Sequence, residues 1–163
     1  MLGKTTPVNT PHAVQFALME TSVPSETHPI LNLIQAYFDP VDPVNYGHLL
    51  GATVPPETSP KHVFHTNSPT DTYSPPAGLN AMARALRATY ILPVADEIDG
   101  VPTADAPFGG NVTHEAAAYS ILGRQYEADG YDGHFVLFRN ATAQGDVAEF
   151  LGTAVTLGVP EIR

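Results

Sequence analysis

Two apolar, strand-like runs in the second half of the chain each end in a turn and are each followed by a helical pattern. The first run, residues 62–67, is rich in β-branched and aromatic side chains and stops at Ser68 and Pro69. The second run, residues 119–126, leads into an acidic, glycine-bearing loop over residues 127–133. Because strands that alternate with helices are typical of an α/β sheet, this half of the chain predicts an α/β fold.

The two helices that complete this alternation have recognisable boundaries. After the first turn, Pro75 and Pro76 can open a helix, and residues 77–88 are rich in Ala, Leu, Met and Arg. Near the C-terminus, residues 145–155 place apolar side chains at helical spacing, and Gly158 and Pro160 end that pattern. We therefore expect a sheet with flanking helices.

The region between the two strand-like runs is less regular. Residues 89–94 form a short apolar run that contains Pro93, and because proline cannot donate to a strand ladder we expect an edge segment there. Residues 96–111 are rich in Gly, Pro and Asp and predict a surface excursion. Within it, residues 108–111 (Phe-Gly-Gly-Asn) are interpreted as a turn rather than as an oxyanion-hole loop.

The first sixty residues predict short helices and loops, so we divide the chain into a helical, cap-like segment over 1–60 and an α/β portion over 61–163. Helix starts are expected at Thr10, Thr27 and Asp42, each close to a proline. Helical spacing predicts one apolar stripe that would pack on something larger, made of Leu31, Ile34, Tyr37 and Phe38.

Composition narrows the possible functions. The 163 residues suffice for one modest core. Seventeen acids against seven bases give a formal charge of −10, which would repel a nucleic-acid backbone. The absence of cysteine excludes disulfides and thiolate chemistry. No apolar run approaches eighteen residues and no signal peptide is visible, so we expect no membrane span, while the localisation stays open.

Two side chains in the turns after the strand-like runs suggest chemistry. Asp71 would sit at the carboxyl end of the first strand, where open α/β sheets build their sites, and His134 would lie in the loop after the last strand. A serine hydroxyl becomes a good nucleophile when an imidazole takes its proton and a carboxylate fixes the imidazole tautomer. Asp71 and His134 are therefore the predicted catalytic residues.

Each of these residues also has a structural interpretation. Asp71 could be a turn carboxylate that binds its own backbone. His134 could instead be a loop histidine that binds Asp132 or a backbone group. Asp132 could compete as the acid that orients His134, although residues two apart seldom face each other.

The segment from about His28 to the end resembles the C-terminal part of a bacterial α/β-hydrolase of the esterase or lipase type. The matching stretches are residues 39–46 (DPVDPVNY), 70–76 (TDTYSPP) and 132–135 (DGHF). The acid precedes the histidine, which is the chain order of that family after its nucleophile. The resemblance implies a partial hydrolase-like sheet, with Asp71 as the triad acid and His134 as the general base.

The nucleophile half of such an enzyme is missing from this sequence. No Gly-x-Ser-x-Gly segment occurs, and Ser68, Ser74 and Ser120 lack the flanking glycines of a nucleophile elbow. The resemblance thus implies a fragment, or a portion that a complementing N-terminal half completes, or an inactive relative. It implies an ester substrate and needs no cofactor. A binding or assembly module, including a homo-oligomer built through an exposed sheet edge, is the alternative.

The histidine count raises a metal hypothesis that the spacing does not favour. His62 and His65 are the closest pair, but residues three apart on a strand point to opposite faces. His114-Glu115 lacks the second histidine of a zincin helix. The isolated histidines are His12, His28, His48 and His114. We therefore expect no metal site, and metal-dependent hydrolase or dioxygenase chemistry stays a distant option.

Overall fold

The structure is a computed structural model that describes residues 4–22, 25 and 27–163. Its α-helices are α1 (Thr10–Ala17), α2 (Pro29–Phe38), α3 (Pro76–Leu86), α4 (Val136–Arg139) and α5 (Ala141–Leu157). Four 3₁₀ turns are η1 (Asp39–Val41), η2 (Pro43–Asn45), η3 (Gly47–Leu50) and η4 (Gly133–Phe135). The strands are β1 (Val63–Asn67), β2 (Thr89–Ile91), β3 (Thr103–Ala104), β4 (Phe108–Gly109), β5 (Val112–His114), β6 (Ala117–Tyr119), β7 (Ile121–Gln125) and β8 (Glu161–Ile162).

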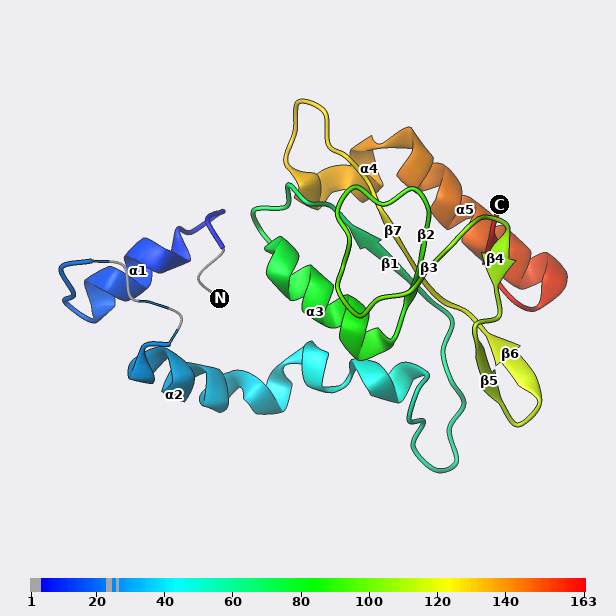
Figure 1. Cartoon of the computed structure of the whole chain (residues 1–163), viewed down its shortest axis with the longest axis horizontal. Coiled ribbons are helices and arrows are strands. Elements are labelled where there is room, and N and C mark those ends of the chain that lie inside the picture. The colour runs from blue at the N-terminus through cyan, green and yellow to red at the C-terminus, as the bar shows by residue number, and fades with distance from the viewer. Residues whose placement is uncertain (1–3, 23–24, 26) are drawn as a thin grey trace.

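A four-stranded parallel sheet in the order β1-β7-β2-β3 forms the centre of the fold. Helix α3 lies on one face of this sheet, and α4 and α5 lie on the other (Figure 1). Two small antiparallel pairs, β4 with β8 and β5 with β6, complete the strands. The predicted α/β fold with a sheet and flanking helices is thus confirmed at this level.

The longest strand pairing joins the two runs that the sequence singles out. Strands β1 and β7 pair in parallel from Val63 opposite Ile121 to Asn67 opposite Gln125. Residues 63–67 and 121–125 are therefore strands, as predicted, and their carboxyl ends lie next to each other. The loops that carry Asp71 and His134 start from these neighbouring ends.

The expectation of an edge segment at residues 89–94 is wrong. Strand β2 lies between β7 and β3, and all three of its residues are buried. The strand ends at Ile91, two residues before Pro93, so the proline never has to donate within the ladder. An apolar run that ends before its proline can therefore sit inside a sheet.

The predicted surface excursion over residues 96–111 contains two short strands. Strand β3 joins the main sheet beside β2, and β4 pairs with β8 from the C-terminus. The interpretation of residues 108–111 as a turn is therefore wrong for Phe108 and Gly109. Their partner lies about fifty residues away, which no local pattern reveals.

The helix boundaries depend on their capping residues. Helix α3 begins at Pro76 as predicted, and α5 ends at Gly158, whose φ of 77° suits glycine. Helix α5 begins earlier than predicted, at Ala141, because the Asn140 side chain accepts a hydrogen bond from the Ala143 N–H and caps it. No helix within the described residues is both long and apolar enough to cross a bilayer.

The N-terminal helices start one residue away from the expected caps. Asn9 rather than Thr10 caps α1, and His28 rather than Thr27 caps α2. Asp42 caps η2 as predicted, because its carboxylate accepts a hydrogen bond from the Val44 N–H. A sequence with adjacent polar residues does not show which of them turns its side chain to the helix.

Much of the N-terminal segment makes few contacts with the rest of the structure. Turns η2 and η3 contact α3, but α1 and α2 lie to one side of the sheet (Figure 1). Helix α1 has no buried residue, and Leu31 is the only buried residue of α2. Tyr37, from the predicted apolar stripe, is 79% exposed. Within the predicted stripe, Leu31 is therefore buried and Ile34 half-buried, whereas Tyr37 and Phe38 are exposed.

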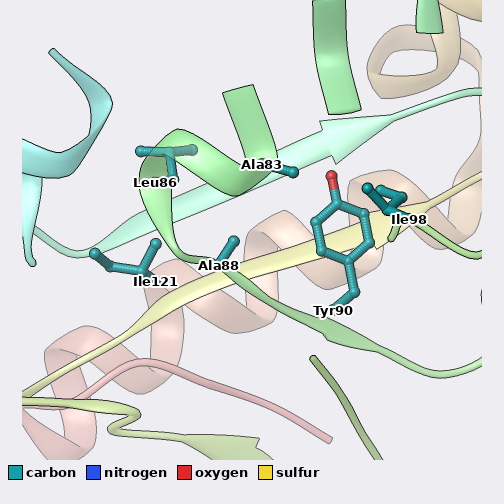
Figure 2. Packing of buried hydrophobic residues seen from close by; sticks show 6 residues of the cluster. All are labelled: Ala83, Leu86, Ala88, Tyr90, Ile98 and Ile121. Atoms are coloured by element: carbon teal, nitrogen blue, oxygen red, sulfur yellow. The ribbon is translucent and has the colours of Figure 1, made fainter. Parts of the chain in front are cut away.

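The core on the α3 side is built around Tyr90 (Figure 2). Its ring lies over β7 at Gly123, where an added Cβ would come within 2.2 Å of the ring. Across the sheet, Gly123 pairs with both His65 of β1 and Tyr90 of β2. The missing side chain lets the Tyr90 hydroxyl reach the His65 Nδ1 at 2.6 Å.

Replacing Gly123 should disturb this core. We expect Gly123→Ala to lower the free energy of unfolding by about 1–3 kcal/mol, since the methyl group overlaps the Tyr90 ring. Gly152→Ala is the matched control, because Gly152 lies within α5 with nothing near its added Cβ. The control should stabilise by about 0.5–1 kcal/mol. Urea unfolding measures both, and equal effects of the two variants would contradict the close approach.

Burial of His65 should make the stability depend on pH. Desolvation lowers the pKa of His65 in the folded state, so below its ordinary pKa of 6.5 the unfolded chain binds the proton more readily. We therefore expect the free energy of unfolding to fall as the pH drops below about 6.5. His65→Gln should flatten this dependence, whereas substitution of the exposed His12 by Gln should not. Unfolding curves between pH 5 and 8 provide the test.

Candidate functional site

Folding brings the two predicted catalytic residues together. The Nδ1 atom of His134 lies 3.3 Å from the Oδ2 atom of Asp71, although 63 positions separate the residues along the chain. Asp71 belongs to the loop over residues 70–76 that follows β1, named here the acid loop. His134 belongs to the loop over residues 131–135 that follows β7, named here the histidine loop.

Asp71 makes both of the contacts that the sequence left as alternatives. Its Oδ1 atom accepts hydrogen bonds from the backbone N–H groups of Tyr73 at 2.9 Å and Ser74 at 2.7 Å. These bonds shape the turn that leads into α3. Its Oδ2 atom faces His134. Asp71 is only 7% exposed, and the backbone N–H groups of Tyr73 and Ser74 hold its carboxylate in this orientation.

The imidazole of His134 is fixed by aromatic neighbours. The Tyr73 ring stacks on it with centroids 4.7 Å apart and planes inclined by 19°. The Phe135 ring meets it edge to face at 5.3 Å. The His134 side chain is 40% exposed, and its Nε2 atom makes no hydrogen bond to a hydroxyl within the described residues. The ring is therefore oriented on one side and open on the other.

The tautomer of His134 follows from its partner. An ionised carboxylate can only accept hydrogen bonds, so Nδ1 must carry the proton that points to Asp71. In the neutral ring Nε2 then holds the lone pair. An imidazole arranged in this way can take a proton from a group placed on its exposed side.

Asp132 lies in the histidine loop but does not orient the His134 ring. Its Oδ1 atom accepts from the His134 backbone N–H at 2.9 Å and from the Thr72 N–H at 3.3 Å. Its Oδ2 atom accepts from the Thr72 hydroxyl at 2.5 Å. The interpretation of Asp132 as a competing acid for the ring is therefore not supported, although Asp132 binds His134 through the backbone.

The pKa of Asp132 reflects these contacts. Burial opposes the charged form, but hydrogen bonds from the Thr72 hydroxyl and from the His134 and Thr72 N–H groups outweigh it, with help from the charge of protonated His134. Together they hold the pKa of Asp132 below its usual value. The carboxylate therefore stays ionised and keeps accepting from both loops.

The two loops touch at Gly133. An added Cβ at this position would lie 2.4 Å from the Ser68 Oγ and 2.6 Å from the Asp71 nitrogen. The Gly133 N–H also donates to the Thr70 carbonyl at 3.3 Å. Only glycine allows this close approach. A glycine between Asp132 and His134 is visible in the sequence and can indicate a close backbone approach, but the sequence does not show what the glycine contacts.

The candidate serines take structural positions. Ser68 is buried, and its hydroxyl lies 3.2 Å from that of Thr70. Ser120 is fully buried, and its hydroxyl contacts the Pro160 carbonyl and accepts from the Gly110 N–H. Ser74 contributes its backbone N–H to Asp71. None of the three hydroxyls is hydrogen-bonded to His134.

The closest histidine pair considered for a metal, His62 and His65, binds other groups. The Nδ1 atom of His62 accepts from the Ser120 N–H at 3.1 Å, and that of His65 meets the Tyr90 hydroxyl. Over residues 4–22, 25 and 27–163 no three acidic or histidine side chains gather in a group that could hold a metal ion.

A hollow of about 290 Å³ opens beside the acid loop, at the carboxyl edge of the sheet. Thr70 lines it together with the acidic side chains Asp96 and Glu127. Neither Asp71 nor His134 lines it. Two carboxylates at its wall would disfavour an anionic group there.

Comparisons with known proteins give the chain no relative. No family model matches it, and neither a curated protein nor a solved structure matches it. The function must therefore be argued from the geometry of the Asp71–His134 pair.

Proposed function

We propose that the chain is the C-terminal portion of a serine ester hydrolase and supplies the triad acid, Asp71, and the general base, His134. The observation that carries this proposal is the contact between the Asp71 carboxylate and the Nδ1 atom of His134, whose side chain is 40% exposed. The serine would come from a polypeptide segment outside the described residues. The substrate class is a carboxylic ester, and the reaction is acyl transfer to water.

The position of the pair in the sheet supports this proposal. Acid and histidine follow two neighbouring parallel strands, β1 and β7, at their carboxyl ends. Ligands of open α/β sheets bind at that edge. The same arrangement fits the resemblance to α/β-hydrolases, in which the acid precedes the histidine in the chain. The sheet would then be the part of a hydrolase-like sheet that carries these two residues.

The chemistry follows from the tautomer. Nε2 of His134 would remove the proton from the serine hydroxyl while the oxygen attacks the carbonyl carbon of the ester. The imidazolium, stabilised by Asp71, would then give that proton to the leaving alcohol as the acyl–oxygen bond breaks. In the second half, Nε2 would take a proton from water while the water oxygen attacks the acyl carbon. The imidazolium would then return that proton to the serine oxygen as the serine–acyl bond breaks and the carboxylic acid leaves.

The isolated chain should show a remnant of this reactivity. Because an imidazole can itself attack an activated ester, we expect slow hydrolysis of p-nitrophenyl acetate that depends on His134. His134→Ala should lower the rate above buffer by on the order of 10²-fold, and Asp71→Asn should also lower it. Release of p-nitrophenol measures the rate.

His114→Ala is the control for that assay, because His114 lies in β5, on the hairpin at the other end of the molecule (Figure 1). It should keep the full rate. A rate that is insensitive to both His134→Ala and Asp71→Asn would contradict the proposed general base and its acid. Equal losses of rate in all three variants would show that the loss is not specific to the Asp71–His134 pair and would also contradict the proposal.

A second candidate is an assembly module, and two observations favour it. In the register of β1 with β7, the backbone groups of Phe64 and Thr66 point away from β7, and they have no partner within the described residues. Such an edge can recruit another strand. Exposed apolar side chains of α1 and α2 lie beyond the sheet, among them Phe16, Leu33, Tyr37 and Phe38.

If the chain forms an oligomer through α1 and α2, substitution of an exposed leucine should affect the oligomer only where that leucine lies on these helices. Leu33 in α2 and Leu151 in α5 are 68% and 59% exposed. We expect Leu33→Asp to dissociate an oligomer, since a charge would be buried at the contact, whereas Leu151→Asp should leave it intact. Sedimentation velocity gives the mass. A chain that is monomeric at every concentration would argue against homo-oligomeric assembly.

A further inference from the structure

We propose that Asp132 is a positioning residue that keeps the His134 Nδ1–H directed at Asp71, by tying the histidine loop to the acid loop through Thr72. Its importance for catalysis rests on the proposed function, but its effect on the His134 tautomer does not. Asp132 itself makes no hydrogen bond to the imidazole; it binds the backbone of His134.

The contacts of Asp132 span the two loops. One carboxylate oxygen accepts from the backbone N–H groups of His134 and Thr72, and the other accepts from the Thr72 hydroxyl. Hydrogen bonds to an ionised acceptor are stronger than those between neutral groups. Three such bonds on one side chain therefore fix Thr72, next to Asp71, relative to His134.

The other links between the loops are weaker or longer. The Gly133 N–H reaches the Thr70 carbonyl at 3.3 Å, and the Asp71–His134 contact is itself 3.3 Å long. The Tyr73 ring stacks on His134 and restricts the plane of the imidazole, but stacking does not select which ring nitrogen faces Asp71. The 2.5 Å contact between the Thr72 hydroxyl and the Asp132 Oδ2 atom is therefore the shortest of the polar contacts that join the two loops.

Thr72 is itself held in place by contacts with the N-terminal segment. Its carbonyl accepts hydrogen bonds from the backbone N–H groups of Thr5 at 3.2 Å and Thr6 at 3.3 Å. Its hydroxyl lies 2.8 Å from the Thr6 hydroxyl. The carboxylate of Asp132 thus binds a residue that Thr5 and Thr6 also bind.

The two acids then have separate tasks around one histidine. Asp71 faces the ring and sets which nitrogen carries the proton, while Asp132 holds the backbone that carries the ring. Without Asp132, the His134 N–H and both donors of Thr72 would lose their acceptor. The loops would separate, and the imidazole would no longer be held to the Nδ1–H form.

The test uses the full chain with ¹⁵N-labelled histidine at a pH where the imidazole is neutral. Long-range proton–nitrogen correlation spectra report which ring nitrogen of His134 bears the proton. We expect the Nδ1–H form in the natural sequence. Asp132→Ala should shift His134 towards the Nε2–H form that free histidine favours, and should weaken the proton contacts between the Tyr73 and His134 rings.

Three further variants make the result specific. Asp129→Ala removes an exposed acid from the preceding loop and should leave the tautomer unchanged. Asp132→Asn keeps one acceptor oxygen and should retain part of the Nδ1–H form. Thr72→Val removes the hydroxyl contacts with Asp132 and Thr6 but keeps the backbone bond to Asp132. It should shift the tautomer in the same direction as Asp132→Ala, so the proposal can be tested even if Asp132→Ala does not fold.

Asp71→Asn separates this proposal from the proposed function. If Asp71→Asn shifts the tautomer but Asp132→Ala and Thr72→Val do not, the positioning role of Asp132 is overturned while the Asp71–His134 pair stands. If Asp71→Asn has no effect, the pair itself fails and the general-base proposal with it. If all three shift the tautomer and Asp129→Ala does not, the positioning role is supported.

Discussion

The parallel pairing of β1 with β7 is the constraint on which the candidate site depends. It sets Asn67 opposite Gln125 and continues when the Tyr126 N–H donates to the Asn67 carbonyl at 2.9 Å. The residues that follow β1 and β7 therefore leave the sheet at the same edge. A parallel pair has no tight turn to set its register, so the interior contacts must do so. Phe64, which stacks on Phe150 of α5, is one such contact.

Two glycines allow the close approaches that this arrangement needs. Gly123 admits the Tyr90 ring over β7, and Gly133 admits the acid loop beside the histidine loop. Gly123 lies within β7, and Gly133 lies in the histidine loop, eight residues beyond the end of that strand. Backbone contact of this kind couples the core to the site, because a shift of β7 moves the start of the histidine loop. The packing around Tyr90 is therefore part of what places His134.

The sequence predicted local secondary structure better than it predicted which strands pair with each other. Runs of β-branched and aromatic residues predicted β1 and β7, and the proline and glycine signals predicted the start of α3 and the end of α5. The misplaced β2 shows the limit, since a strand's place in a sheet depends on residues far away in the chain. The Asp71 and His134 side chains were predicted from their chain order and now lie within hydrogen-bonding distance. Thr72 and Tyr73 were not recognised as contacts of the histidine loop, because nothing in their spacing shows that the loop returns to them.

The alternatives posed for Asp71 turn out not to compete. A turn carboxylate and an acid that orients a histidine need different lone pairs, and Asp71 provides one oxygen for each. The backbone bonds to Oδ1 restrict rotation of the carboxyl group and so direct Oδ2 at the imidazole. A buried acid with both oxygens engaged is a better anchor for a histidine than a freely rotating one, because less order has to be gained when the charged pair forms. The structural role is thus the reason that Asp71 can face the imidazole with its second oxygen.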